Sequence, residues 1–436
     1  MPTVLITRGR VIDPASGLDR VTDVAVADGR VAAVGDGLDR SAADRIIEAD
    51  GCIVMPGLID PHVHLREPGH EHKETIETGA RAAAAGGFTS VCCMPNTSPA
   101  LDTPELVRFV YDRAERAACR VFPVSAATRG RKGEELTEFE LLARAGAVAF
   151  SDDGDCIASA GMMARVLAMT AHVGKVFMQH AQEPTMTRGG VMHAGPIATR
   201  LGLGGWPREA EEIIVERDVR LARRAGAAYH VQHISSGETV DIIRKARAGG
   251  VRVTGEASPH HLHLTHEACD DYNSLGKVNP PLREAADIEA LRAGVADGTI
   301  TILGTDHAPH SEDEKALPFE DAPFGFIGLE TALPLYVEAL VTSGAIDWPR
   351  LVELLTTEPA RLCGLDRSGL GQLAVGGHAD LSIFDPREEW RLTTHDLRGA
   401  SRNTPFFGRA LKGRAVFTLC RGAVTHDLTP VRMAGR

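Results

Sequence analysis

The middle of the chain alternates short apolar runs with amphipathic stretches of helical pattern. The runs are continuously apolar, which is typical of parallel strands that are buried on both faces. Helical patterns follow most of them, as over residues 73–87, 104–118 and 238–250. The eight expected strands lie within residues 57–65, 89–96, 120–128, 148–153, 176–181, 229–234, 251–258 and 301–309.

This order of elements predicts an α/β protein built on a closed (β/α)8 TIM-type barrel, because each strand is followed by a segment that can return to the start of the next. An open, doubly wound sheet is the alternative. That fold normally carries a Gly-rich phosphate loop after its first strand, and residues 57–75 contain none. The barrel is therefore favoured.

The two ends of the chain differ from the middle in their residue composition. Residues 1–55 and the stretches 378–386 and 413–426 are rich in β-branched residues and are punctuated by Gly and Asp. Their similarity predicts that the two ends pack together as one small, discontinuous, sandwich-like β domain. The expected boundaries are 1–55 and 369–436 for this domain and 56–368 for the catalytic barrel.

Composition narrows the possible partners. A formal net charge of -12 disfavours nucleic acid, whose phosphates require a basic face. No run approaches the ~18 to 20 apolar residues needed to span a bilayer, and the N-terminus lacks the layout of a signal peptide. The eight cysteines are scattered, with no CxxC pair. We therefore expect a cytoplasmic protein that binds neither membrane nor nucleic acid and acts on a small molecule.

Candidate metal ligands stand at the ends of five of the eight expected strands. In a barrel the carboxyl ends of all strands converge on one face, which is where such folds carry out chemistry. Imidazole and carboxylate groups together suit zinc and related cations. The residues are His62, His64, Asp153, His180, His233 and Asp306.

The spacing of these residues favours a shared site. His62 and His64 are two residues apart, so on a strand both imidazoles point to the same side. Asp152 and Asp153 are adjacent and face opposite sides, so only one of them can contribute. The set exceeds what one tetrahedral ion needs, which suggests two ions bridged by a carboxylate. Two such ions supply hydroxide near neutral pH.

Longer motifs point to a known family. The segment over residues 56–97, PGLIDPHVHLREPGHEHKETIETGARAAAAGGFTSVCCMPNT, resembles the opening of the amidohydrolase superfamily and, within it, of the class I dihydroorotases. The resemblance covers essentially the whole chain. It continues through AFSDDGD, QHAQE, YHVQHIS, EASPHHL, KVNPPLR, TDHAPH, PFGFIGLETALPL and SRNTPFFG.

The resemblance implies a role for each candidate ligand. His62, His64 and Asp306 would hold the first of two Zn²⁺ ions, and His180 and His233 would hold the second. Asp153, together with a hydroxide, would bridge them. Asp306 would also be the catalytic residue that carries the proton from the attacking water to the leaving ring nitrogen.

The resemblance also implies the substrate and the residues that bind it. The reaction would be the reversible hydrolysis of (S)-dihydroorotate to N-carbamoyl-L-aspartate, in the de novo biosynthesis of pyrimidines. A guanidinium suits the substrate carboxylate, and amide and backbone groups suit the ring N–H and C=O groups. The implied substrate-binding residues are His64, Arg66, Asn96, Asn279, His310, Phe324 and Gly325.

The candidate metal ligands also distinguish this function from two rival functions. Allantoinases and dihydropyrimidinases typically bridge their metals with a carboxylated lysine on the fourth strand, whereas residues 148–154 contain no lysine. Non-catalytic relatives that act as scaffolds for aspartate transcarbamoylase have lost metal ligands, and every ligand is present here. The family suggests a homo-oligomer, such as a dimer, and leaves association with aspartate transcarbamoylase open.

A few further residues depart from the pattern or have other uses. Gln182 and Gln232 flank the ligands where relatives often have an acidic residue and Cys, which bears on metal affinity. His230 and His307 should face away from the metals by alternation. The charged, Pro-rich residues 311–325 form either a lid over the site or a solvated connection. His260 and His261 are expected to pack around the site rather than to bind metal.

Overall fold

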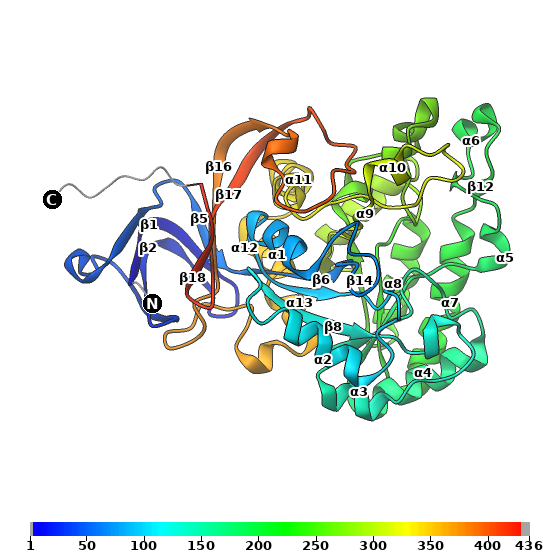
Figure 1. Ribbon diagram of the computed structural model, residues 1–436, viewed down its shortest axis with the longest axis horizontal. Coiled ribbons are helices and arrows are strands. Elements are labelled where there is room, and N and C mark those ends of the chain that lie inside the picture. Colours follow the sequence, from blue (N-terminus) through cyan, green and yellow to red (C-terminus); the bar gives the residue numbers. More distant parts are fainter. Residues whose placement is uncertain (1–2, 429–436) are drawn as a thin grey trace.

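The computed structural model describes residues 3–428, which form a barrel and a sheet beside it (Figure 1). The barrel is parallel throughout and contains all eight expected strands, so the predicted fold class is confirmed. In chain order the strands are β6 (Leu58–Val63), β7 (Phe88–Cys93), β8 (Arg120–Ser125), β9 (Ala149–Phe150), β10 (Val176–Gln179), β13 (Ala228–Val231), β14 (Val253–Ala257) and β15 (Ile302–Leu303).

Every strand of the barrel is hydrogen-bonded to the next strand in this order. The ring closes between the last strand and the first, where Val63 pairs with His307 in parallel register and the His64 N–H donates to the His307 carbonyl at 2.8 Å. The residues of β6 and β7 are all buried, as expected for strands covered on both faces. Closure brings the metal-ligand candidates of the first and eighth strands side by side.

Helices surround the barrel and connect its strands. Several begin at a residue whose side chain accepts from the backbone of the first turn, such as Thr75, Thr103 and Ser159. The connecting helices are α1 (Ile76–Ala85), α2 (Pro104–Arg113), α3 (Phe139–Ala145), α4 (Ala160–Val173), α7 (Glu209–Ala225), α8 (Gly237–Ala248) and α9 (Ala285–Ala296). After β15 come α10 (Glu312–Lys315), α11 (Ala332–Tyr336), α12 (Trp348–Leu355) and α13 (Thr357–Cys363).

A small insertion separates β10 from α7. It contains α5 (Pro184–Thr187), β11 (Met192–His193), α6 (Pro196–Leu201) and β12 (Gly205–Trp206), and its two short strands pair in parallel. Within residues 3–428, no helix is both long and apolar enough to cross a membrane.

The second sheet is formed by both ends of the chain, as predicted. Its order is β18-β17-β16-β5-β1-β2-β3, with β4 also paired to β1. Strand β5 joins the two ends, because it pairs in parallel with β1 and antiparallel with β16. The strands are β1 (Val4–Asp13), β2 (Leu18–Ala27), β3 (Arg30–Gly35), β4 (Arg45–Glu48), β5 (Ile53–Pro56), β16 (Leu381–Arg391), β17 (Ala410–Cys420) and β18 (Ala423–Asp427).

This terminal sheet has a hydrophobic core of its own, to which Val4, Val54 and Phe417 contribute from strands far apart in sequence. It is attached to the barrel by close contacts. The Thr418 hydroxyl donates to the Ala84 carbonyl at 2.8 Å, at the end of α1. The exact domain boundaries at residues 55/56 and 368/369 remain a prediction.

Candidate metal and substrate site

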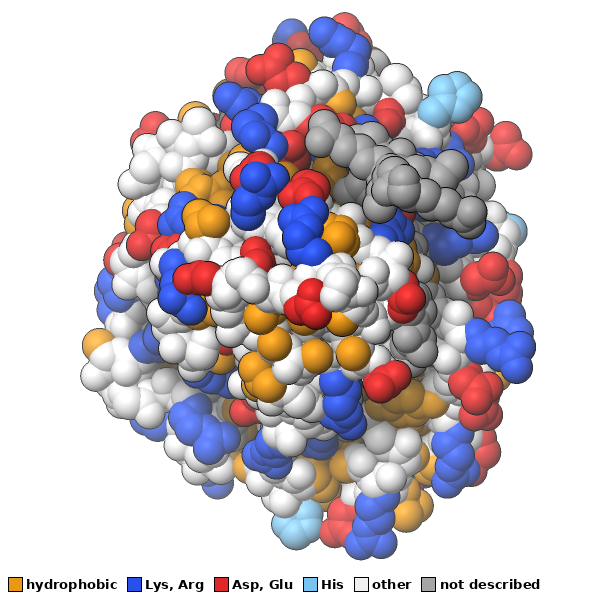
Figure 2. Space-filling view, turned by 90° about the vertical axis from the view of Figure 1, so that its left-hand side faces the viewer, with side chains coloured by type: hydrophobic (Ala, Val, Ile, Leu, Met, Phe, Trp, Pro, Cys, Tyr) orange, Lys and Arg blue, Asp and Glu red, His pale blue; other side chains and the backbone are white. Residues whose placement is uncertain are grey.

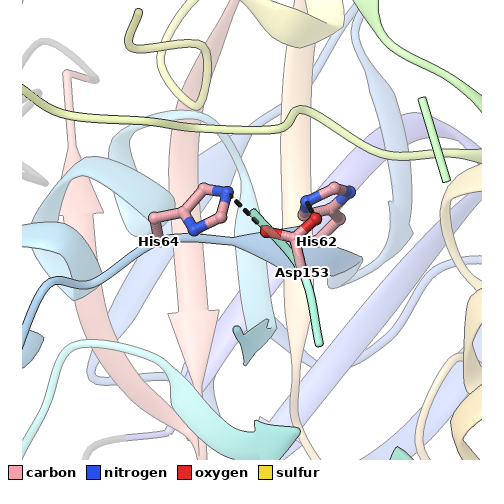
Figure 3. Close-up of side chains that lie close together, drawn as sticks. All are labelled: His62, His64 and Asp153. Atoms are coloured by element: carbon pink, nitrogen blue, oxygen red, sulfur yellow. Dashed lines mark ion pairs between the residues drawn. The ribbon is translucent and has the colours of Figure 1, made fainter. Parts of the chain in front are cut away.

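The carboxyl ends of the barrel strands bring the six ligand candidates into one buried cluster. Two groups in it could each hold an ion: His62, His64 and Asp153, shown in Figure 3, and Asp153, His180 and His233. Asp153 belongs to both groups, so its carboxylate lies between them. All of these side chains are buried, and Asp153 is only 2% exposed.

The distances within the cluster converge on Asp153. Its Oδ1 lies 3.4 Å from His62 Nε2, 3.5 Å from His180 Nδ1 and 3.8 Å from His233 Nε2, and its Oδ2 lies 3.4 Å from His64 Nε2. Figure 3 shows the two histidines approaching this carboxylate from opposite sides.

The closing aspartate lies beside the first pair of histidines. Oδ1 of Asp306 is 3.5 Å from His62 Nε2 and 3.1 Å from His64 Nε2. Two atoms that share a tetrahedral zinc ion at about 2.0–2.1 Å lie roughly 3.3–3.4 Å apart. The donor set and its separations therefore fit a divalent cation on this side of Asp153.

An unusual backbone conformation sets the direction of several side chains at the site. His233 and Asp306 follow their strands with φ values of 31° and 49°, and Arg66 follows β6 with a φ of 61°. Side chains other than glycine rarely adopt this left-handed region, and it costs about 1–3 kcal/mol per residue. Such strain at three site residues indicates that their orientation is imposed by the surrounding structure.

The two adjacent aspartates face opposite ways, as alternation requires. Asp152 accepts from the backbone N–H groups of Ala127 and Thr128 at 2.8 and 3.0 Å. Burial raises the pKa of Asp152 to about 6. Burial also raises the pKa of Asp153, but the charge of His62 and a hydrogen bond from His180 outweigh this and hold it well below its usual range. Only Asp153 is therefore disposed to bind cations.

No role was predicted from the sequence for Glu256 at the end of β14, although its side chain contacts the histidines of the cluster. Its Oε1 lies 2.5 Å from His62 Nδ1 and accepts from the His233 N–H at 3.0 Å, and its Oε2 lies 3.0 Å from His230 Nε2. The contact to Nδ1 leaves Nε2 of His62 free to face the cluster. A charged residue in an otherwise apolar strand is the signal that could have identified it.

Two side-chain amides contact further ligand candidates. His64 Nδ1 donates to Asn96 Oδ1 at 2.8 Å, so the Asn96 side-chain NH2 is left for other partners. His180 Nε2 donates to Gln182 Oε1 at 3.0 Å, and the same oxygen accepts from Asn279 Nδ2 at 3.2 Å. Gln182 thus connects a metal-ligand candidate to a predicted substrate-binding residue.

Cationic and polar side chains gather beside the cluster. Arg66 Nε donates to the Pro309 carbonyl at 3.1 Å, and its Nη2 lies 3.3 Å from His310 Nε2. His310 Nδ1 faces Lys73 Nζ at 3.4 Å, and Nε2 donates to the Phe324 carbonyl at 2.8 Å. Because both His310 nitrogens have these partners, the Nη2 protons of Arg66 remain available to an anion.

Burial and charge act together on these groups. Burial lowers the pKa of Arg66 to about 10, which leaves it charged at neutral pH. Burial and the neighbouring charges of Arg66 and Lys73 hold the pKa of His310 far below its usual range, so this imidazole is neutral. Lys73 is paired with Glu314 at 2.8 Å, so Arg66 provides the unpaired positive charge of this partly buried pocket, which suits a carboxylate.

The loop over residues 311–325 closes one side of this pocket. Gly325 has a φ of 110°, and an added Cβ would lie 2.6 Å from the Ala308 side chain, so only glycine fits. Its N–H donates to the Lys277 carbonyl, and its carbonyl accepts from Lys315 and Asn403. The Gly325 carbonyl thus already accepts two hydrogen bonds, and the Phe324 carbonyl accepts one from His310. Substrate binding by this backbone therefore requires a further hydrogen bond at one of these carbonyls, and it stays a prediction.

Asn403 is a second residue that sequence reasoning did not assign, although it lies in the motif SRNTPFFG. Its Oδ1 accepts from the His310 N–H at 3.1 Å, and its Nδ2 donates to the Ala308 carbonyl at 3.1 Å. A residue from the C-terminal part of the chain thus holds the loop that carries His310. The contact joins segments more than ninety positions apart in sequence.

The remaining histidines lie outside both ligand groups. His230 contacts Glu256, and His307 Nδ1 accepts from the Gly328 N–H at 3.1 Å. His261 Nε2 donates to the Pro280 carbonyl at 3.1 Å, and His260 packs against the Phe326 ring at 4.7 Å between centroids. Burial lowers the pKa of His260 to about 4, so it is neutral.

Comparison with known proteins identifies relatives over the whole chain. The family model described as "Dihydro-orotase-like" matches residues 51–239. A dihydroorotase from Geobacter sp. (strain M21) is 47% identical over 97% of this chain and 99% of its own length. A dihydroorotase from Pelotomaculum thermopropionicum is 46% identical over 97% of this chain and 98% of its own.

Solved structures share the architecture at lower identity. The L-hydantoinase (dihydropyrimidinase) from Arthrobacter aurescens superposes with a TM-score of 0.87 at 28% identity, covering 99% of this chain and 97% of that one. A D-hydantoinase gives a TM-score of 0.85 at 25% identity, covering 98% and 96% of the two chains. Both the barrel and the terminal sheet fall within these matches.

Proposed function

The chain belongs to the dihydroorotase family of cyclic-amide hydrolases, and we propose that the cluster around Asp153 is the site where it opens and re-forms the ring of dihydroorotate. The observation that carries this proposal is a pair of candidate metal-ligand groups that share one aspartate and lie directly beside the partly buried pocket of Arg66. Such a pair suits hydrolysis of an amide, and the pocket suits a carboxylate on the same small molecule.

For the metals, we infer two Zn²⁺ ions. His62, His64 and Asp306 would hold one, His180 and His233 the other, with Asp153 between them. When bound, such ions lower the pKa of a coordinated water and polarise a carbonyl oxygen. Metal analysis of the purified protein should return two equivalents per chain; one equivalent or none at full activity contradicts this assignment.

For the substrate, Arg66 would bind the carboxylate through its free Nη2 protons, with the Asn96 amide beside it. The neutral His310 donates to Phe324 and so holds the loop in place, while Asn279 is placed by Gln182 to meet a ring amide group. Each of these groups is positioned by a hydrogen bond within the protein, so little side-chain freedom is lost when the substrate binds.

For the proton, Asp306 is the proposed shuttle. Burial raises its pKa, but the contact with His64 and the charge of His62 outweigh that effect and keep the carboxylate ionised. As an acceptor it takes a proton from the attacking water while the water oxygen adds to the ring carbonyl. When the ring C–N bond breaks, Asp306 gives that proton to the nitrogen.

The nearest rival is a hydantoinase-type activity, because the solved structures in the comparison have that function. Side-by-side turnover of dihydroorotate, allantoin and dihydrouracil by the metal-loaded protein separates the candidates. We expect dihydroorotate to be preferred by at least about a hundredfold, since the other two lack the carboxylate that Arg66 would bind. Equal turnover of dihydrouracil contradicts the assignment, and no turnover of any of them favours a non-catalytic scaffold.

We also propose an oligomeric state and a cellular location, neither of which is determined by the geometry of this site. We expect a cytoplasmic homo-oligomer that uses neither nucleic acid nor a membrane. Association with aspartate transcarbamoylase is testable by co-sedimentation of the two purified proteins. A shift of both to one faster boundary supports association, and independent boundaries contradict it.

A further inference from the structure

Among the described residues, two lysines near the proposed substrate pocket are buried without a carboxylate in contact. Lys277 is 1% exposed, and Lys315, the last residue of α10, is 5% exposed. Within residues 3–428, every hydrogen bond of their ammonium groups goes to a main-chain carbonyl. Lysine is almost never fully buried unless it is paired, because its charge is separated from water. Here main-chain dipoles take the place of an acidic partner.

The side chain of Lys277 lies against the loop that follows α10. Its Nζ donates to the Phe319 carbonyl at 2.6 Å and to the Glu320 carbonyl at 3.0 Å. The same nitrogen lies 4.5 Å from the centre of the Phe324 ring and 5.3 Å from that of Phe319, within the range of cation–π attraction. The backbone carbonyl of Lys277 accepts from the Gly325 N–H. One residue thus contacts both ends of this loop segment.

Lys315 contacts the same loop at further carbonyls. Its Nζ donates to the carbonyls of Pro323, Gly325 and Lys277 at 2.9, 3.2 and 3.4 Å. An ammonium group has three N–H donors, so three carbonyls satisfy it, whereas a neutral amine would turn its lone pair towards one of them. Burial lowers the pKa of Lys315 to about 7 and that of Lys277 to about 8, so both are mainly charged in mildly acidic solution.

The loop has no regular secondary structure that could satisfy these carbonyls. The structure describes all of residues 316–331 and has no helix or strand there. Buried backbone carbonyls need hydrogen-bond partners, and the two lysines supply them at four positions between residues 319 and 325. Opening of the loop would break these charge-assisted bonds together with the packing of the buried Phe319 ring. The contacts therefore favour a loop that stays in place.

The same contacts fix backbone groups of the proposed substrate pocket. The Phe324 carbonyl accepts from His310 at 2.8 Å, and the carbonyl of Gly325 is one of the acceptors of Lys315. Lys277 lies two positions before Asn279, so its anchored side chain also restricts the segment that carries this amide. Three predicted substrate-binding residues thus depend on the two lysines for their position.

We propose that Lys277 and Lys315 are positioning residues, whose ammonium groups hold residues 319–325 as a fixed wall of the substrate pocket. The proposal rests on the proposed function, because the wall matters to turnover only if dihydroorotate binds beside it. It gives residues 311–325 a role that is neither a mobile lid nor a solvated connection. The lysines act through the backbone that they hold and do not touch the substrate.

Hydrogen exchange of the wild-type protein tests the fixed wall without a substitution. N-carbamoyl-L-aspartate is added at concentrations that steady-state kinetics show to be saturating. It should slow exchange in peptides that cover residues 316–325 by less than about threefold, because a fixed wall is already ordered. A lid that closes over the ligand becomes protected when the ligand binds, so a larger slowing overturns the proposal.

Lys315→Met tests the positioning role, because it removes the charge and keeps an unbranched side chain. Exchange over residues 316–325 should quicken by about tenfold or more. At about pH 6.5, KM for dihydroorotate should rise by roughly tenfold while kcat changes less, since binding groups are displaced and the reacting groups are not. Lys277→Met should act in the same direction. Quicker exchange with unchanged KM overturns the positioning role, and unchanged exchange in both variants overturns the wall.

The matched control is Lys175→Met, at a partly buried lysine that directly precedes β10 at the opposite end of the barrel. Burial lowers the pKa of Lys175 as well. This variant should leave both KM and the exchange of residues 316–325 unchanged, and an equal effect indicates general loosening and overturns the proposal. If the wild-type protein does not turn over dihydroorotate, the proposed function fails, while the exchange of the two loop variants still decides whether the lysines hold the wall.

Discussion

The carboxyl end of the barrel and the terminal sheet bury very different groups. The barrel end holds buried carboxylates and imidazoles close together, among them Asp153, Glu256 and Asp306. The terminal sheet buries an apolar cluster with only isolated carboxylates such as Asp13 among its buried groups, and it carries surface pairs such as Arg8 with Glu48. Figure 2 shows that face of the molecule, with Lys and Arg interspersed among Asp and Glu.

This difference indicates that the barrel end provides the chemistry and that the terminal sheet mainly provides stability. At the barrel end, buried like charges lie close together and several residues adopt left-handed backbone conformations, and both features oppose folding. Such costs are typical of sites whose geometry is required for chemistry. Among the described residues, the terminal sheet collects no comparable group of buried carboxylates and imidazoles, and it adds apolar burial that stabilises the whole chain. Substitutions at the barrel end should therefore affect chemistry more than stability, and substitutions in the sheet core should do the reverse.

The largest effect is expected for Asp306→Asn. Removing the proton acceptor should lower turnover of dihydroorotate by about a thousandfold or more, while the melting temperature does not fall, because one buried charge is lost. Steady-state rates and thermal unfolding measure the two quantities. Asp19→Asn, at an exposed ion pair in the terminal sheet, is the control and should leave turnover unchanged. Retention of most activity by Asp306→Asn refutes the shuttle.

The converse effect is expected for Phe417→Ala in the core of the terminal sheet. Loss of this fully buried ring should lower the free energy of unfolding by about 3–5 kcal/mol. Below the unfolding transition, turnover per folded molecule should equal that of wild type. Val424→Ala, on the exposed strand β18, should change the stability little. A turnover defect in folded Phe417→Ala protein contradicts the division between the two regions.

Arg66→Met tests the anion pocket. Loss of the charged hydrogen bonds should raise KM for dihydroorotate by roughly a hundredfold, at about 1.5–3 kcal/mol per bond. The unfolding temperature should stay the same or rise, because Arg66 is partly buried and has no carboxylate in contact. Initial-rate kinetics over a wide substrate range provide the measurement. Unchanged KM and kcat show that the carboxylate binds elsewhere.

Glu256→Gln weakens the support beneath the cluster. Loss of the charged contact to His62 should reduce metal affinity by about 10–100-fold, as for other partners of metal-binding histidines. Competition with a chromophoric chelator measures this without relying on activity. Glu74→Gln, a buried carboxylate that holds the Ala400 N–H instead, is the matched control. Equal loss of affinity in both variants points to a general packing defect.

The smallest effect is expected for Glu48→Gln at the surface of the terminal sheet. A hydrogen bond from Arg40 and another from Thr7 lower the pKa of Glu48 to about 2. Because this pKa is below its unfolded value, the contribution to stability is present above about pH 4.5 and disappears as the pH falls toward 2. Urea unfolding should show wild type more stable than the variant by under about 1 kcal/mol at pH 7. A difference that persists at pH 2 contradicts this origin.

Much of the barrel was predictable because its rules are local or topological. Continuous apolar runs mark buried parallel strands, and parallel strands in a barrel present their carboxyl ends on one face. Spacing alone therefore placed His62 and His64 together and separated Asp152 from Asp153. Family resemblance then anticipated the reaction, which the relatives along the whole chain support.

What the sequence could not determine are contacts between segments that only folding brings together. Glu256 meets His62 because β14 lies near β6 across the closed barrel, 194 positions away in the chain. Asn403 meets His310 because the C-terminal segment packs over the active-site loop. No periodicity encodes such partners, since they depend on which strands and loops become neighbours in space. The sequence by itself specified the ligand candidates and the fold that collects them, and the tertiary structure decided which side chains hold those candidates in place.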